Sequence, residues 1–197
     1  MTPSTIAPRA IQLGRRCRLS WPIVAGVSAA FLFGIAEGAV SYARRSPVMK
    51  PHVPGTNAIT VHVVLAVVAA LMVIVIQIWR SRRPLQGTPS PWAAPFSATA
   101  WARMRRTVRL ADGVSPRNLG RIIAMVALAL LALYAPWRIG AQITGGLDPN
   151  ATVNAWGGPT YVGALLAHSL DAVLGFYAVS FLLGKLLAPA RPEITRP

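Results

Sequence analysis

Hydrophobic residues gather in four long stretches, and polar or proline-rich connections separate each stretch from the next. The stretches cover residues 21–42, 58–79, 119–137 and 161–187. A helix needs roughly 20 apolar residues to cross the hydrocarbon core of a bilayer, so each stretch is long enough to span it. Lipid offers the backbone no hydrogen-bonding partner, and no alternation with period two indicates barrel strands. Each stretch is therefore predicted to be a helix.

The composition supports this interpretation. The 197 residues are 54% hydrophobic and 13% charged, and the mean hydropathy is +0.49. These values exclude an ordinary soluble domain and a disordered chain. We expect an all-α, polytopic membrane protein with four transmembrane helices in a bundle (residues 21–187). A basic arm (1–20) precedes the bundle and a short tail (188–197) follows it.

The formal net charge of +15 bears on orientation. Most Lys and Arg residues fall in the arm, in or beside the connection 80–118, and near the C-terminus, whereas the opposite connections hold only Arg44, Arg45, Lys50 and Arg138. The positive-inside bias therefore predicts that both termini are cytoplasmic. We interpret the arginines as topology signals and contacts to anionic lipid headgroups, and not as a nucleic-acid surface. The preference for arginine over lysine, with abundant alanine, indicates the inner (plasma) membrane of a bacterium.

The connection 80–118 is predicted to contain an amphipathic helix over residues 98–111, with Ser97 as its N-cap and Gly113 just past its end. A helix with basic and apolar sides is typical of the headgroup region, although a docking site for another protein or disorder would also fit. The residues expected to meet lipid headgroups are Trp101, Arg103, Arg105, Arg106 and Arg109.

Small residues at four-residue spacing predict close helix packing. The first stretch carries Gly26, Ala30, Gly34 and Gly38, and the last carries Gly163, Ala167 and Gly175. Small side chains let helix backbones approach closely in a membrane. We expect these two helices to pack against each other and the third helix to face lipid over much of its girth.

Four ionisable side chains fall within the apolar stretches: Glu37, His62, His168 and Asp171. At 1.5 Å per residue they lie roughly 9, 6, 11 and 15 Å from the outer ends of their helices. Ionisable groups inside a membrane usually face the interior of a bundle. We therefore expect one polar layer, built by the first, second and last helices, in the outer half of the bundle.

The favoured role of this layer is to join helices by hydrogen bonds, in a scaffold or accessory subunit of a membrane assembly or in a homo-oligomer. One alternative is a bis-histidine haem b electron carrier, with His62 and His168 as the metal ligands. Another is a proton-coupled small transporter, in which Glu37 and Asp171 titrate. An enzyme is less favoured, because no catalytic cluster has the required spacing.

Overall fold

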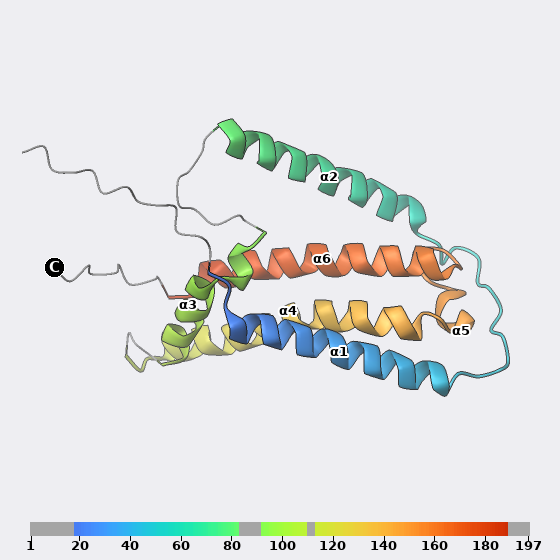
Figure 1. The fold of residues 1–197 in the computed structure, drawn as a ribbon, viewed down its shortest axis with the longest axis horizontal. Helices are drawn as coiled ribbons and strands as arrows, with labels where there is room; N and C mark the ends of the chain where they lie inside the picture. Colours follow the sequence, from blue (N-terminus) through green and yellow to red (C-terminus); the bar gives the residue numbers. More distant parts are fainter. Residues whose placement is uncertain (1–17, 83–91, 110–112, 189–197) are drawn as a thin grey trace, which may run out of the picture.

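The described part of this computed structural model comprises residues 18–82, 92–109 and 113–188, and it is helical. The long helices are α1 (Trp21–Ala43), α2 (Ile59–Arg82), α4 (Pro116–Gly145) and α6 (Tyr161–Leu186), and the short elements are the 3-10 turn η1 (Ala94–Phe96), α3 (Ala98–Val108) and α5 (Pro149–Thr152) (Figure 1). All four long helices are long and apolar enough to cross a membrane, so the predicted all-α membrane class is confirmed. Most of the basic arm, most of the tail and the last residues of the predicted helix 98–111 lie outside the described residues.

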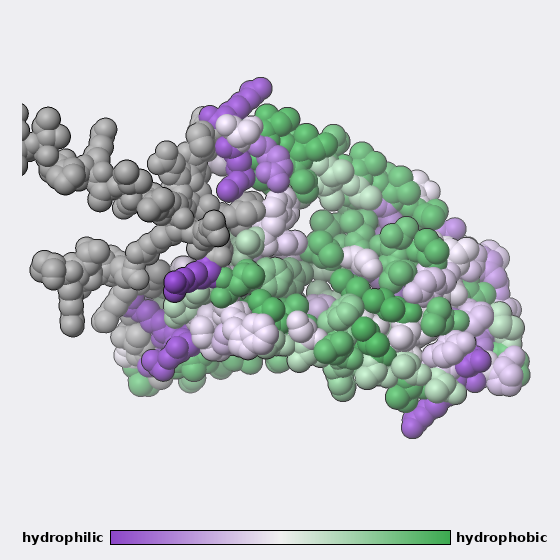
Figure 2. Space-filling model, viewed as in Figure 1, coloured by the Kyte–Doolittle hydropathy of each residue, from purple (hydrophilic) through white to green (hydrophobic). Residues whose placement is uncertain are grey.

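The surface of the molecule is divided along the helix axes. Apolar residues cover the middle, and hydrophilic residues gather toward the two ends (Figure 2). We call the end where α1 begins and α6 finishes the terminal end, and the opposite end, which holds α5 and the α1–α2 connection, the distal end (Figure 1). An apolar belt between two polar ends is the arrangement that a bilayer requires.

Helices α1, α4 and α6 lie side by side, with α4 in the middle (Figure 1). Gly34 and Gly38 of α1 pack against α4 and not against α6, which corrects the predicted pairing. A Cβ atom added at Gly34 would meet the Trp137 carbonyl oxygen, and one at Gly38 would meet the Ala141 carbonyl oxygen. Gly140 of α4 makes the reciprocal approach to the Phe31 carbonyl oxygen. The pairing depends on glycines in both helices, and Gly140 lies beyond the predicted end of the third stretch.

The other small residues singled out in the sequence do not join α1 to α6 either, and their surroundings differ. A Cβ atom at Gly26 would meet nothing within 4 Å, so this position makes no close approach. Ala30 is half-buried and Ala167 is buried. Gly163 lies against the Gly157 carbonyl in the connection before α6, and a Cβ at Gly175 would meet nothing within 4 Å.

Helix α4 is longer and more enclosed than predicted. It runs from Pro116 to Gly145, through Pro136, instead of ending at Trp137. Its flanks contact both α1 and α6, which leaves less of it to face lipid than expected, and Ile123, Leu130 and Leu131 remain exposed. Thr144 donates a hydrogen bond from its hydroxyl to the Ile35 carbonyl of α1 (2.8 Å), and Tyr161 of α6 donates one to the Ile143 carbonyl of α4 (3.0 Å).

Helix α2 leans away from the other long helices and joins them near its distal end (Figure 1). Its buried residue is His62, and nearly all of its apolar side chains are exposed. The Ala58 amide, just before the helix, donates to the Trp156 carbonyl (2.8 Å). Most of the α2 surface is therefore available to lipid or to another membrane helix.

Two asparagines fasten the α1–α2 connection across the distal end. The Asn150 amide group donates to the carbonyls of Ser46 (3.2 Å) and Val48 (2.9 Å), and its Oδ1 accepts from the Lys50 amide (2.7 Å). The Asn154 Oδ1 accepts from the Val53 amide (2.8 Å). These bonds satisfy backbone groups that have no helix or sheet partner.

At the terminal end, α3 closes the end of α6. Ser97 caps α3 as predicted and accepts a hydrogen bond from the Ala100 amide (3.1 Å). The Arg103 guanidinium donates to the carbonyls of Gly184 (2.7 Å), Leu187 (2.9 Å) and Ala188 (2.9 Å). The last carbonyls of a helix have no partner within that helix, and a cation there also complements the helix dipole.

This contact gives Arg103 a role that the sequence did not predict. Arg103 faces inward, where three backbone carbonyls accept from its guanidinium, and Val108 of the same helix is 53% exposed. Thr107 is buried, and its hydroxyl accepts from the Ala188 amide (3.1 Å). The inward side of α3 is polar because it meets unpaired backbone groups. Arg105 and Arg109 are exposed, and Trp101 and Arg106 are half-buried.

Replacing Arg103 with methionine is expected to lower the free energy of unfolding by about 1.5–2 kcal/mol, because bonds from a charged donor are stronger than neutral ones. Arg105→Met removes an exposed arginine of the same helix and should change it by less than about 0.5 kcal/mol. Thermal unfolding in detergent, followed by circular dichroism, measures both. Equal melting temperatures for the two variants would contradict the assigned role of Arg103.

Candidate functional site

Arg138 lies inside α4, about two turns before its distal end at Gly145. At 1.5 Å per residue, this places it roughly 10 Å from that end. The sequence interpretation ended the span at Trp137 and assigned Arg138 to the outer connection. Pro136 does not end the helix: proline removes one backbone donor, and the contacts of the following turns with α1 and α6 keep the chain helical.

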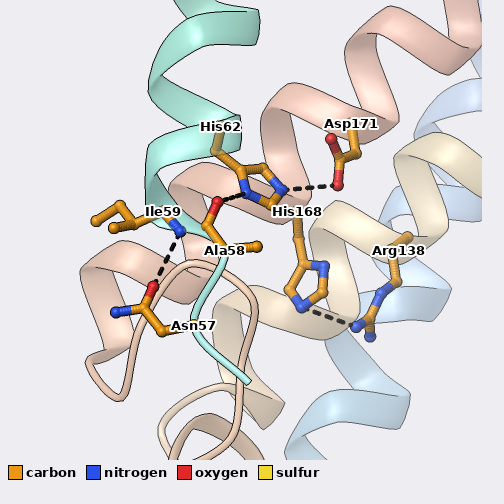
Figure 3. Close-up of polar contacts among 7 residues, drawn as sticks. All are labelled: Asn57, Ala58, Ile59, His62, Arg138, His168 and Asp171. Atoms are coloured by element: carbon orange, nitrogen blue, oxygen red, sulfur yellow. Dashed lines mark hydrogen bonds and ion pairs between the residues drawn. The ribbon is translucent and has the colours of Figure 1, made fainter. Parts of the chain in front are cut away.

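His62 and Asp171 join α2 to α6 by the contact shown in Figure 3. The His62 Nδ1 atom donates to the Ala58 carbonyl (2.9 Å), and its Nε2 atom lies 3.2 Å from Asp171 Oδ2. His62 is buried, whereas the Asp171 side chain is 40% exposed. Both nitrogens of His62 are therefore engaged with oxygen atoms.

His168 points to a different partner, Arg138 of α4 (Figure 3). The Arg138 Nη2 atom donates to His168 Nε2 at 3.2 Å. A guanidinium can only donate, so His168 Nε2 must accept, and this assigns His168 as the neutral tautomer with its proton on Nδ1. No ion pair joins Arg138 to a carboxylate of the described residues.

Glu37 does not lie with these side chains. It is exposed on α1, and α4 separates α1 from α6 (Figure 1). Of the four ionisable residues singled out in the sequence, the structure brings together His62, His168 and Asp171, and Arg138 takes the place expected for Glu37. The helical period shows which residues share a face of a helix but not which neighbour that face meets. The sequence therefore could not show that Arg138, and not Glu37, lies beside the histidines.

A cavity of about 550 Å³ lies between α4 and α6, under the connection that contains α5. Arg138, His168 and Asp171 line its distal part, beside Asn154 and Trp156 of that connection. Farther toward the terminal end the lining is apolar apart from the hydroxyl of Tyr134, with the residues Leu131, Ala135, Ala172, Gly175, Phe176 and Val179. Its volume is within the range of small-molecule sites, about 300–1,000 Å³.

An aromatic contact lies behind the apolar wall of the cavity. Phe176 stacks on Phe96 of η1, with ring centroids 5.4 Å apart. The neighbouring Tyr177 donates its hydroxyl proton to the Trp92 carbonyl (3.2 Å). The segment before α3 therefore reaches along α6 and supports the wall of the cavity.

The two histidines do not fit a bis-histidine haem site. Iron would need a free ring nitrogen from each histidine, but His62 has neither nitrogen free and His168 Nε2 accepts from Arg138. No group of three or more His, Cys, Asp or Glu side chains suited to a metal ion occurs among the described residues. We derive no chemistry through haem or a metal.

Sequence reasoning missed three residues of the site: Arg138, and Asn154 and Trp156 of the connection between α4 and α6. For Arg138 a signal existed, because the apolar pattern continues through Ile139 and Ile143 and a helix to Gly145 would have placed Arg138 inside the span. For Asn154 and Trp156 we find no such signal. Their position over the cavity follows from the path of the connection between α4 and α6.

Comparisons with models of protein families, with curated proteins and with solved structures found no match to this chain.

Proposed function

We propose that this protein binds an amphiphilic small molecule of the lipid class in the cavity between α4 and α6. The observation that carries the proposal is the division of the cavity lining. Charged and imidazole groups lie at the distal end, where Arg138, His168 and Asp171 gather, and apolar side chains line most of the rest. A ligand with a polar head and an apolar chain matches this division, and a membrane supplies such molecules at high concentration.

The charged groups stop at Asp171. Farther toward the terminal end the Tyr134 hydroxyl is the one polar side-chain group among the described lining residues. On α6 the lining continues with Ala172, Gly175, Phe176 and Val179, and Phe96 stacks on Phe176. A proton or ion pathway needs polar groups across the whole bilayer. Such a path does not continue in the cavity, so the arrangement favours binding over transport. Binding is compatible with the role of an accessory subunit of a membrane assembly. In that role the bound amphiphile would be part of the assembly or be delivered to it.

We further propose an orientation, supported by the distribution of basic residues. The terminal end carries Arg18, Arg80, Arg82, Arg105, Arg109 and Lys185. The positive-inside bias then places the terminal end in the cytoplasm and the cavity mouth in the outer leaflet of a bacterial plasma membrane. In this orientation Arg105 and Arg109 of α3 meet anionic headgroups.

The proposal is tested by filling the cavity. Gly175 lines it, and a Cβ atom added there meets nothing within 4 Å, so Gly175→Leu should fold and occupy ligand space. We expect gently solubilised wild-type protein to retain an amphiphile, detected by native mass spectrometry, and Gly175→Leu to retain several-fold less. Gly184→Leu is the matched control, since it lies in the same helix and a Cβ atom added there also meets nothing within 4 Å. The bond from Arg103 to the Gly184 carbonyl is to the backbone, which the substitution keeps. Wild-type protein without a bound amphiphile, or equal retention in both variants, would contradict the proposal.

A further inference from the structure

The hydrogen-bond donors and acceptors around the cavity determine its charge. The Ala58 carbonyl can only accept, so the His62 Nδ1 atom carries a proton. A second proton must lie between His62 Nε2 and Asp171 Oδ2, since otherwise two acceptors would face each other at 3.2 Å. Whether that proton is on nitrogen or oxygen, the two side chains together carry no net charge.

Arg138 is therefore left with an unbalanced positive charge. Its partner His168 is neutral, because Nε2 accepts from the guanidinium. Asp171 lines the same cavity, but its charge is already balanced within the pair with His62. Adding the neutral pair, the neutral His168 and the arginine gives one net positive charge at the polar end of the cavity.

Such a charge inside a span is costly to leave without a counter-ion. Arg138 is half-buried, and its guanidinium has five donor protons, of which one bond to His168 uses one. Guanidinium groups match the paired oxygens of carboxylates and phosphates. His168 keeps a second donor, its Nδ1 proton, on a side chain that also lines the cavity.

We propose that the ligand's head is a singly charged oxyanion, a carboxylate or a phosphodiester, whose charge Arg138 balances. This inference rests on the proposed function and names its ligand class. The oxyanion accepts from the free guanidinium protons at the distal end, and the apolar chain runs past Gly175 toward Val179. A fatty acid and an anionic phospholipid share this chemistry.

The test uses the full chain in detergent and compares oleate with oleyl alcohol, which has the same chain without the charge. Binding is titrated by native mass spectrometry. We expect wild-type protein to bind oleate at least about tenfold more tightly than oleyl alcohol, a preference that Arg138→Gln should reduce to about twofold and Arg138→Lys should partly keep. Arg105→Gln, an exposed arginine at the terminal end, is the matched control and should keep the full preference.

A parallel arm separates the two sources of the oxyanion. Dioleoyl phosphatidylglycerol is compared with dioleoylglycerol, which lacks the phosphate. A charge preference in the oleate arm identifies a fatty-acid carboxylate, and one in the phospholipid arm identifies a phosphodiester. Either result supports the inference, provided that Arg138→Gln removes the preference.

The outcomes distinguish this inference from the proposed function. Equal binding of charged and uncharged probes to wild-type protein would overturn the inference and leave the amphiphile site in place. A preference that survives in folded Arg138→Gln would overturn it as well, because another group would then recognise the charge. The comparison of charged and uncharged probes on wild-type protein needs no variant, so it can overturn the inference even if Arg138→Gln does not fold. Binding of no probe would overturn both proposals.

Discussion

Replacing Gly34 with leucine is expected to destabilise the protein by at least about 3 kcal/mol and to separate α1 from α4. A side chain at this position would overlap the Trp137 carbonyl oxygen and approach the Ala141 amide nitrogen. Both atoms belong to the α4 backbone, so no rotamer change relieves the overlap, and overpacking against rigid neighbours already costs about 1–3 kcal/mol. Thermal unfolding in detergent measures the loss.

The control for this prediction lies in the same helix. Gly26 has nothing within 4 Å of an added Cβ atom, so Gly26→Leu should leave the melting temperature within a few degrees of the wild type. The two variants make the same chemical change in the same stretch of small residues. If they melted together, the close approach of α1 to α4 would not be the contact that holds these helices.

The second large effect is expected at Asp171. Replacing it with leucine removes the carboxylate that binds His62 and leaves a buried imidazole nitrogen without its partner. Breaking a buried pair by removing one member costs about 3–5 kcal/mol, and the partial exposure of Asp171 lowers our expectation to about 2–3 kcal/mol. Because α2 joins α6 mainly here, the expected result is movement of α2 away from α6.

Electron–electron distance measurements between spin labels at Met72 of α2 and Val173 of α6 detect this movement. Both positions are exposed, and Cys17 is replaced by serine to leave only the introduced thiols. Asp171→Leu should give a longer and broader distance distribution than the wild type. Asp171→Asn is the control, since its amide can donate to His62 Nε2 and should keep the distribution narrow. Identical distributions for leucine and asparagine would mean that other contacts hold α2.

The helices themselves were largely predictable. A bilayer-spanning stretch needs continuous apolar residues and internally bonded backbone, and both requirements are local properties of the sequence. The boundary that failed, at Trp137, failed because Pro136 and Arg138 resemble the end of a span. Both stay helical because α1 and α6 contact the turns that follow.

The pairing of residues was less predictable. His62, His168 and Asp171 were grouped by depth, and the structure places them near one another. Depth does not specify direction around a helix axis, so it could not separate Glu37, which is exposed, from Arg138, which lines the cavity. The contacts of Arg103 in α3 could not be predicted for a related reason. A charged side chain is expected to face water or lipid headgroups, but the carbonyls at the end of α6 form a polar surface inside the protein and bind Arg103 there.

Four membrane-length helices and the ionisable groups within them follow from the sequence alone, because hydrophobicity and backbone hydrogen bonding act over neighbouring residues. Three features emerge only from tertiary packing: α1 pairs with α4, α2 joins α6 near its distal end, and Arg138 faces a cavity without a carboxylate partner among the described residues. These features depend on which helix faces are complementary in shape. That complementarity arises from residues far apart in the chain, such as Gly34 with Trp137 and His62 with Asp171.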